Sequence, residues 1–269
     1  MKKIIKKFNE EEIFDEEKFC KNLSNIGIDQ STSNKICRKI YDKLPSVVKS
    51  EDVFKITLNE LRKINSYYAL RYNLKRAIFN LGPTGYPFEQ YFAKILAEYG
   101  YETIINEFIE GQCLNYEIDI VAVKEDKHYI IECKFHHSFE IPSDLKNVLY
   151  VYGRWVDIKE KYPYVIPWLA TNTKLSSEAI DFANCRNIKL TAWKYPPGES
   201  LEKLIENKNL YPVTIILNAN KYIIQKFIDN HYVLTNDLLR DDIDNIVKKT
   251  GIDKKKIKKI IEEIKVLGI

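Results

Sequence analysis

Residues 116–135 read YEIDIVAVKEDKHYIIECKF, and the rest of the chain can be interpreted outward from them. Two runs rich in β-branched and aromatic residues, 116–123 and 128–135, flank a short charged turn, which is typical of a β-hairpin. With Glu125 and Asp126 at the tip, Asp119 is expected directly opposite Glu132, with the two Cβ atoms roughly 5 Å apart. Lys134 lies two residues beyond Glu132, so its side chain is expected on the same face.

The hairpin therefore gathers three charged groups in strands that are apolar enough to be buried. Two carboxylates at this spacing repel each other, and ionised groups are costly to desolvate. A divalent cation would relieve both costs, and oxygen ligands at a partly hydrated site suit Mg²⁺. With a lysine to stabilise negative charge or position a water, this chemistry suits hydrolysis of a phosphodiester. The alternative is a structural ion pair of Lys134 with Asp119 or Glu132 at the sheet edge.

The composition is that of a globular protein with room for one large domain or two to three small ones. The chain has 269 residues, of which 45% are hydrophobic, and its net charge of +4 allows a nucleic-acid partner without requiring one. No signal peptide is visible and no apolar run approaches the ~20 residues that span a bilayer, so we expect a cytoplasmic protein with no membrane partner. Because five scattered cysteines form no CxxC pair, we expect reduced thiols rather than a zinc ribbon or a disulfide scaffold.

The N-terminal segment, residues 1–81, is expected to be mostly helical. A short strand, a turn at Asn9 and a second strand element open the chain, and Asp15 can cap the helix that follows. Further helices are expected at 31–43, 57–64 and 66–80.

This segment resembles an ATP-cone, the nucleotide-binding regulatory module of ribonucleotide reductases and their repressors. The residues that carry the resemblance are Ile5-Lys6-Lys7, Glu12, Phe14-Asp15, Lys18, Arg71-Tyr72 and Ala77-Ile78-Phe79, although Phe8-Asn9 replaces the usual Asp-Gly. The resemblance implies a regulatory ATP or dATP site in which Lys6 and Lys7 meet phosphates. It also implies that the nucleotide or its ions contact Glu12, Asp15 and Lys18. The alternative is a helical domain with a solvated Lys/Glu surface. Because no GxxxxGK[ST] phosphate loop is present, sensing is expected rather than hydrolysis.

The central segment, residues 84–197, is expected to form a mixed sheet with helices on its faces. A helix begins near Pro87 and ends at Gly100. After the strand at 101–108 and the hairpin, we expect helices at 143–161 and 175–186 alternating with strands at 164–171 and 188–193. Glu89 lies in the first turn of the first helix, where complementing the helix dipole would by itself explain an acidic residue.

This segment resembles the restriction-endonuclease-like PD-(D/E)xK nucleases, in the branch with archaeal Holliday-junction resolvases and type IV restriction nucleases. Phe88-Glu89, Gly100-Tyr101, Glu117-Ile118-Asp119 and Ile131-Glu132-Cys133-Lys134 occur in the expected order, although no proline precedes Asp119. The resemblance implies that Asp119 and Glu132 bind Mg²⁺ or Mn²⁺ and that Lys134 assists the attacking water. It implies that Glu89 supports the metal site from the first helix.

Other polar residues leave two interpretations open. His136 and His137 follow the hairpin and could contact a phosphate or shuttle a proton, or they could be solvated. Arg154 could clamp a phosphate, or it could belong to an ordinary amphipathic helix.

In the C-terminal segment, residues 198–269, helices are expected at 218–229, 235–249 and 253–266. The lysines at 254–256, 258 and 259 could meet a DNA backbone or form a solvated face.

The predicted fold is therefore α/β: a mixed-sheet restriction-endonuclease-like core, an N-terminal, mostly helical ATP-cone and a small helical C-terminal segment. The predicted function is a Mg²⁺-dependent DNA endonuclease regulated by ATP or dATP, and it is expected to be a homodimer because cutting both strands usually needs two sites. The alternative is a nucleotide-responsive DNA-binding protein without cleavage activity. The sequence contains no positive sign of a purely structural protein.

Overall fold

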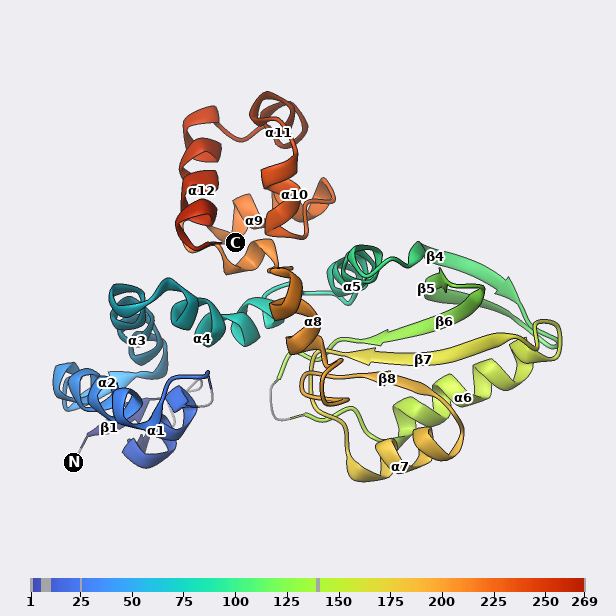
Figure 1. Ribbon diagram of the computed structural model, residues 1–269, viewed down its shortest axis with the longest axis horizontal. Coiled ribbons are helices and arrows are strands. Elements are labelled where there is room, and N and C mark those ends of the chain that lie inside the picture. The colour runs from blue at the N-terminus through green and yellow to red at the C-terminus, as the bar shows by residue number, and fades with distance from the viewer. Residues whose placement is uncertain (1, 6–10, 25, 139–140, 269) are drawn as a thin grey trace. The chain divides into compact units, whose positions relative to one another are not determined.

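The chain forms two compact units, each with a sheet of its own, in this computed structural model (Figure 1). The structure describes residues 2–5, 11–24, 26–138 and 141–268. Unit 1 comprises Met1–Lys75 and Glu263–Gly268, and unit 2 comprises Arg76–Glu262. The division falls inside α4 (Ser66–Phe79) and α12 (Lys254–Val266), so each of these helices contributes to both units. The domain boundaries expected from the sequence, near 81–84 and 197–198, remain predictions.

Unit 1 packs helices against a small mixed sheet in the order β2-β1-β3. β1 (Lys3–Ile5) pairs antiparallel with β2 (Glu11–Ile13) and parallel with β3 (Val47–Lys49). The helices are α1 (Glu16–Ser24), α2 (Gln30–Lys43), α3 (Ser50–Ile64) and most of α4. Their apolar faces form one core, whose members include Phe14, Leu23, Ile36, Ile40, Leu58 and Leu61.

Side-chain caps begin the first two helices of this unit. Asp15 accepts a hydrogen bond from the backbone N–H of Lys18 at 2.9 Å, as the sequence predicts, and Asp29 does the same for Thr32. The strands on either side of Asn9 are confirmed, although Asn9 itself lies outside the described residues. The third strand was not predicted, because its three residues form a strand only through pairing with β1. α3 begins at Ser50, seven residues before the predicted start.

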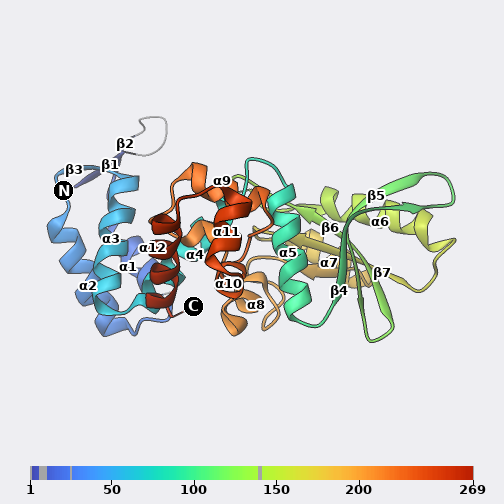
Figure 2. The same ribbon diagram turned by 90° about the horizontal axis from the view of Figure 1, so that it is seen from above.

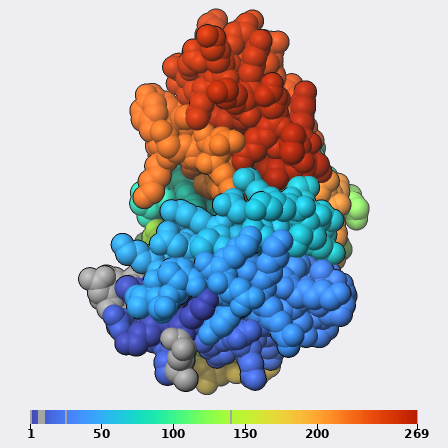
Figure 3. Space-filling view, turned by 90° about the vertical axis from the view of Figure 1, so that its left-hand side faces the viewer, coloured from blue at the N-terminus to red at the C-terminus, as the bar shows by residue number. Residues whose placement is uncertain are grey.

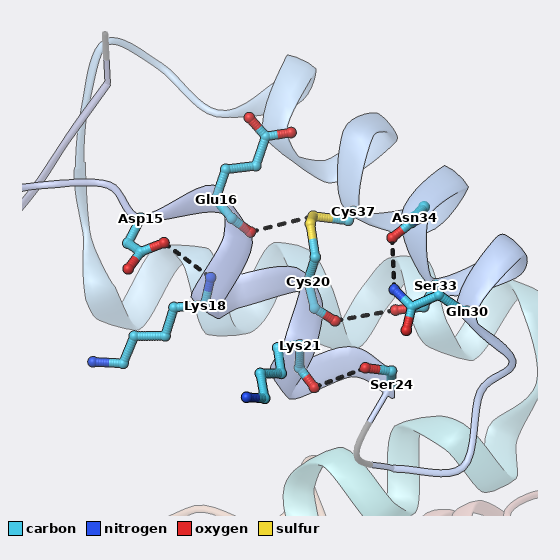
Figure 4. The surroundings of a disulfide bond; sticks show 10 residues. All are labelled: Asp15, Glu16, Lys18, Cys20, Lys21, Ser24, Gln30, Ser33, Asn34 and Cys37. Atoms are coloured by element: carbon cyan, nitrogen blue, oxygen red, sulfur yellow. Dashed lines mark hydrogen bonds between the residues drawn. A yellow bond between two sulfur atoms is a disulfide. The ribbon is translucent and has the colours of Figure 1, made fainter.

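A disulfide joins α1 to α2. It links Cys20 and Cys37, whose Cα atoms lie 5.4 Å apart (Figure 4). The prediction of reduced thiols is therefore wrong for this pair, whereas Cys113, Cys133 and Cys185 are free. Spacing alone does not reveal which cysteines meet in space, because it is the packing of the two helices that brings this pair together.

Unit 2 is organised around a five-stranded sheet in the order β4-β5-β6-β7-β8. β4 (Glu102–Glu110), β5 (Asn115–Lys124) and β6 (Lys127–Lys134) form an antiparallel meander. β7 (Val165–Thr171) and β8 (Lys189–Thr191) continue the sheet parallel to β6. The prediction of an α/β fold with a mixed sheet is confirmed.

Helices cover both faces of this sheet. On β7, Trp168 packs edge-on against Phe92 of α5 (Tyr86–Glu98), with ring centroids 5.7 Å apart. The next residue, Leu169, belongs to a buried cluster with residues of α6 (Leu145–Lys159) and α7 (Ser177–Cys185). Successive strand residues point to opposite faces, so α5 covers one face, and α6 and α7 cover the other (Figures 1 and 2).

The hairpin forms with the predicted register as far as Ile120–Ile131, but the regular pairing stops before the cross-strand pair expected of Asp119 and Glu132. β5 and β6 pair from Lys124–Lys127 at the turn to Ile120–Ile131. Glu125 and Asp126 form the tip with φ values of 50° and 61°, as a tight two-residue hairpin turn requires.

Asp119 lies where the regular alternation of β5 is interrupted. Val121 and Ile130 form a cross-strand pair and share a buried cluster with Ile158 of α6. Ile118 joins the same cluster, although it is three residues from Val121 and strict alternation would place it on the other face. On β4, Asn106 has a φ of 55° at the same level, between the residues that pair with Ile118 and Ile120. Both strands are therefore irregular beside Asp119, as in a β-bulge.

The remaining elements of unit 2 are short helices. They are α8 (Leu201–Lys208), the 3₁₀ helix η2 (Val213–Ile215), α9 (Lys221–Asp229), α10 (Thr235–Arg240), α11 (Ile243–Thr250) and the first part of α12. The single helix predicted at 235–249 is wrong: Asp241 ends α10 in an extended conformation, and Asp242 caps α11. Among the described residues, no helix has both the length and the apolar character that crossing a bilayer needs.

We predict that the disulfide stabilises the α1–α2 pair. In the chain-entropy model, a cross-link that closes a loop of about 15 residues contributes about 3 kcal/mol, and Cys20 and Cys37 are 17 residues apart. Replacing both residues by alanine should lower the protection of α1 and α2 amides in native-state hydrogen exchange by about this free energy. Alanine at both Cys113 and Cys185, which are exposed free thiols, is the matched control and should change nothing. Equal protection in the two double variants would contradict the prediction.

Candidate active site

The candidate site groups three carboxylates and a lysine around the interrupted part of β5. Burial is the main cause that raises the pKa of Asp119 to about 6, and the charge of Glu132 is the second. Burial likewise raises the pKa of Glu89 to about 7, followed by the charges of Asp119 and Glu132. The acidic groups therefore lie close enough to disfavour one another's ionisation. Glu89 and Asp119 thus each experience the charge of Glu132, which pairs with Lys134, and the catalytic and metal-binding roles expected of the four residues remain predictions.

A backbone hydrogen bond holds Asp119 in place. One oxygen, Oδ2, accepts from the backbone N–H of Cys133 at 2.7 Å. The bond lies directly beyond the last regular pair of the hairpin, Ile120–Ile131, so the carboxylate continues the β5–β6 pairing where the backbone of β5 departs from it. The side chain is half-buried, and among the described residues its other oxygen has no hydrogen-bond partner.

Glu132 is buried and is bound by two cations. Its Oε1 lies 2.6 Å from Nζ of Lys134, and its Oε2 lies 2.5 Å from Nη1 of Arg154. The ion pair with Lys134 is the structural alternative that the sequence left open, and it does form. It does not by itself decide between a structural and a catalytic role, because a lysine that assists a reaction beside this carboxylate would occupy the same place.

Arg154 reaches the site from the middle of α6. Its Nη2 donates to the backbone carbonyl of Glu117, and its guanidinium lies 5.3 Å from the ring of Tyr116 and 5.2 Å from that of Tyr150. Only 12% of the side chain is exposed. The sequence suggested a phosphate clamp or an ordinary helix residue and missed the ion pair with Glu132. The i,i+4 spacing of Tyr150 and Arg154 indicates a shared helix face, but it does not indicate a partner on the sheet.

Glu89 lies in the first turn of α5, close to Gly85. A Cβ added to Gly85 would lie 3.2 Å from Oε1 of Glu89, so the carboxylate folds back toward the start of the helix. A helix N-terminus favours the ionised form of an acid. The pKa of Glu89 is nevertheless raised, because burial and the neighbouring carboxylates outweigh that effect. Complementing the helix dipole is therefore not enough to account for this residue.

The donor set fits a divalent cation that carries some of its own water. Carboxylate oxygens are the ligands that Mg²⁺ and Mn²⁺ prefer, and Mg²⁺ commonly binds through one or two of them. The three carboxylates do not all offer oxygens within 4.8 Å of one another: among the described residues, only Glu16, Cys20 and Cys37 meet that criterion, and those two sulfurs are joined in the disulfide. The sequence resemblance names Asp119 and Glu132 as the pair that could hold the ion, with Glu89 in support, and their oxygens are of the kind that such an ion prefers.

The backbone that follows Lys134 is held by a buried amide. Asn172, directly after β7, accepts from the backbone N–H of His136 at 2.8 Å and donates to its carbonyl at 2.9 Å. The His136 ring lies 2.8 Å from Oγ of buried Ser143, and burial lowers its pKa. The exposed ring of His137 packs against Phe135. His136 therefore has a structural place in this network, and sequence reasoning did not identify Asn172.

The residues expected to bind a nucleotide lie in unit 1. Lys6 and Lys7 lie outside the described residues. Glu12, Asp15 and Lys18 are exposed, and Asp15 uses one carboxylate oxygen to cap α1 (Figure 4).

Fold and site together define a mixed α/β protein with a half-buried acidic cluster at an irregular strand. Residues 211–267 match the family described as AF1548-like, C-terminal. An uncharacterized protein from Archaeoglobus fulgidus is 39% identical over 173 residues, which cover 64% of this chain and 97% of that protein. The chain therefore belongs to the AF1548-like family.

A crystal structure is similar over a slightly larger share of the chain. The protein of unknown function AF1548 superposes with a TM-score of 0.61 at 37% identity, covering 69% of this chain and 99% of that one. Can2 from Sulfobacillus thermosulfidooxidans, in complex with cyclic tetra-adenylate, gives a TM-score of 0.34 at 15% identity, covering 65% of this chain and 50% of that one. The MspJI restriction endonuclease with a 27-mer oligonucleotide gives 0.32 at 12% identity, covering 78% and 40%. At these scores, neither of the last two similarities bears on fold or function.

We predict that Glu89 destabilises the metal-free protein at alkaline pH. Its pKa is about 7 in the folded chain, against an ordinary value of 4.5. Between these values the folded state holds the proton more tightly, so stability falls as pH rises from 4.5 to 7. Glu89→Gln removes this dependence. In chelator, the variant should unfold at a higher urea concentration than the wild type at pH 8 and at the same concentration at pH 4.

The control for this measurement is Glu107→Gln, because Glu107 is exposed on β4. It should not change the pH dependence of unfolding. A Glu89→Gln variant that is no more stable than the wild type at pH 8 would contradict the raised pKa.

Proposed function

We propose that the protein is a metal-dependent endonuclease that hydrolyses phosphodiester bonds in DNA. The observation that carries the proposal is the clustering of Asp119, Glu132 and Glu89 beside Lys134, with two carboxyl pKa values raised by burial and mutual repulsion. Such a cluster is costly without a cation and is a common feature of catalytic sites. It matches the PD-(D/E)xK pattern that the sequence resembles.

In the proposed mechanism, Asp119 and Glu132 would hold Mg²⁺ or Mn²⁺, which when bound supplies charge stabilisation at the phosphate. Lys134 donates a hydrogen bond that orients the attacking water. The water oxygen bonds to phosphorus and gives up a proton to Glu89 or to solvent, a P–O ester bond breaks, and the leaving oxygen takes up a proton from solvent. Glu89, with its raised pKa, is placed to accept a proton or to hold a water beside Asp119.

A lysine-rich surface supports a nucleic-acid partner. Residues 248–259, called here the lysine segment, contain seven lysines and one acidic residue, whereas the average of 42 Lys and Arg in 269 residues would give about two basic residues in twelve. The segment's net charge of +6 exceeds the +4 of the whole chain. Clustered positive charge of this kind attracts a phosphate backbone.

The helix pair that carries the lysine segment keeps most of these charges in solvent. α11 ends at Gly251, whose φ is 69°, and Asp253 caps α12 through the backbone N–H of Lys255. The buried side of α12 is formed by Ile257, Ile260, Ile261 and Ile264. Lys249 pairs with Asp241 and Lys254 with Asp244, whereas exposed Lys255, Lys258 and Lys259 have no acidic partner within 4 Å among the described residues. The C-terminal residues are red in the space-filling view of Figure 3.

We further propose that ATP or dATP binding to an ATP-cone-like domain, residues 1–81, regulates the nuclease domain, residues 84–197, and that residues 198–269 form a separate helical segment. Lys6 and Lys7 would meet the phosphates, and Glu12, Asp15 and Lys18 would contact the nucleotide or its ions. A homodimer would provide the two sites that cutting both strands requires. A cytoplasmic location is part of the proposal, although reducing compartments disfavour the Cys20–Cys37 disulfide.

A cleavage assay tests the central proposal. Plasmid, branched and single-stranded DNA are incubated with the protein and Mg²⁺ or Mn²⁺, with and without ATP or dATP. We expect cleavage that chelator abolishes. Asp119→Asn, Glu132→Gln and Lys134→Ala should each lose at least about a hundredfold in rate, the usual scale for a group that takes part in the reaction.

The matched control is Lys124→Ala, because Lys124 lies on the same hairpin and its Nζ binds the backbone carbonyl of Tyr99 instead of a carboxylate. Its cleavage rate should stay near that of the wild type. Equal rates in Lys134→Ala and the wild type would rule out this site. DNA binding that responds to ATP, without cleavage under any metal, would favour a nucleotide-responsive DNA-binding protein instead.

We predict that the lysine segment contributes to nucleic-acid affinity through ionic contacts. Changing Lys255, Lys258 and Lys259 together to glutamate should weaken binding of a DNA duplex. It should also reduce the slope of log affinity against log salt by about 2 to 3, because each lysine that meets a phosphate adds about 0.9. Fluorescence anisotropy over a salt series measures both. The same substitutions at exposed Lys35, Lys55 and Lys221 are the control, and an equal loss there would show a general charge effect only.

A further inference from the structure

Glu132 faces competing demands in the candidate site. Holding a divalent cation with Asp119 requires its carboxylate to serve as a ligand, yet Lys134 occupies one of its oxygens and Arg154 the other. A cation bound at Glu132 would repel a guanidinium that contacts the same carboxylate, because like charges a few ångströms apart at a partly buried site interact strongly. The oxygens of the three carboxylates are also not all within 4.8 Å of one another, so binding an ion between them calls for movement.

Of the two cationic partners of Glu132, Arg154 is the one that we infer can change its partner. Its guanidinium lies against the rings of Tyr116 and Tyr150, which contact it without neutralising its charge. Its Nε is buried and has no hydrogen-bond partner in the part of the chain that the structure describes, so one donor of the fork is unused there. A small cavity lined by Arg154, Glu132, Ile118, Ile130, Ile131 and Val151 adjoins the pair. The guanidinium thus has a donor that is not used, although its other nitrogens bind Glu132, the hydroxyl of Tyr150 and the backbone carbonyl of Glu117.

We propose that Arg154 is a latch: it neutralises Glu132 while the metal site is empty, and it transfers to a phosphate oxygen of the nucleic acid once a divalent cation takes the carboxylate. This inference rests on the proposed nuclease function and assigns a new role to a residue of the same site. The planar fork of arginine suits both partners, since carboxylate and phosphate present similar pairs of oxygens. Arg154 is thus a positioning residue for Glu132 before the metal binds and a substrate ligand afterwards.

The exchange keeps charge balanced at each stage. Without metal, the positive charges of Arg154 and Lys134 face the buried carboxylate of Glu132. With metal, the ion replaces Arg154 at Glu132, and the freed guanidinium meets the negative charge that the phosphodiester brings. Metal and nucleic acid therefore assist each other's binding, because each provides a partner for a group that the other displaces.

The test uses Arg154→Met in the full chain, since methionine keeps the apolar stem between the two tyrosine rings while removing the charge. The first measurement is calorimetric titration with Mn²⁺ in the absence of nucleic acid. We expect the variant to bind Mn²⁺ about tenfold more tightly than the wild type, because the competing cation is gone. The second is affinity for a labelled DNA duplex, with Ca²⁺ in place of Mg²⁺ and, separately, with chelator.

The effect of Arg154→Met on duplex affinity is expected to differ between Ca²⁺ and chelator. Arg154→Met should weaken duplex binding about tenfold with Ca²⁺ and leave it unchanged in chelator, where Arg154 is still engaged with Glu132 in the wild type. A merely structural arginine would not produce this pattern, since its loss would weaken binding equally in both conditions or would also weaken Mn²⁺ binding. Arg154→Lys, which keeps the charge, should bind Mn²⁺ with an affinity near that of the wild type.

Arg186→Met is the matched control, because Arg186 also lies against two aromatic rings, those of Tyr152 and Phe182, and is exposed. It should leave both affinities unchanged. Mn²⁺ binding by the wild type with no gain in Arg154→Met would overturn the latch and leave the nuclease proposal standing. If the wild type binds no divalent cation and Asp119→Asn does not change the rate of DNA cleavage, the nuclease proposal itself fails. Thermal unfolding of each variant in chelator verifies that unit 2 is folded.

Discussion

The hydrogen bond from the backbone N–H of Cys133 to the Asp119 carboxylate stands where the regular pairing of the central hairpin stops. It binds a side chain of β5 to the backbone of β6, one residue beyond Glu132. Without this bond, the backbone N–H of Cys133 on the nearly buried strand β6 would lose its hydrogen-bond partner, because β5 is irregular there, and an unpaired buried donor is costly. The same bond holds the carboxylate of Asp119 close to the backbone of the residue that follows Glu132. The geometry of the candidate site and the continuity of the sheet therefore depend on one contact.

The free-energy cost of burying charge is high at the candidate site, and several of its groups share that cost. Burial and mutual repulsion raise the pKa values of Asp119 and Glu89, whereas Glu132 keeps two cationic neighbours. Replacing buried charged groups by a well-packed apolar core is often neutral or stabilising, so their presence here is not explained by stability alone. Such a combination of burial and charge is a common feature of functional sites, and it is the basis of the proposal made for this one.

Sequence reasoning succeeded where local pattern and tertiary structure agree. The hairpin register followed from alternation and a charged two-residue turn, and the mixed sheet followed from the order of strands and helices. It failed where distant partners decide the outcome. β3 is a strand only because β1 lies beside it, and Cys20 meets Cys37 only because two helices pack together. The break between α10 and α11 depends on the conformation of Asp241, which a continuous apolar periodicity conceals. Arg154 and Asn172 act across the fold, so no spacing in the sequence links them to Glu132 or His136.

The two-residue turn at Glu125 and Asp126 sets the length of the hairpin as well as its shape. Because side chains alternate with a period of two, one extra residue in the turn that was absorbed by a slip of β6 would turn Glu132 to the far face and separate it from Asp119. The length of this turn therefore decides whether the acidic residues of the two strands can meet. A homologue with an altered turn can keep every acidic residue in its alignment and still have lost the centre they form.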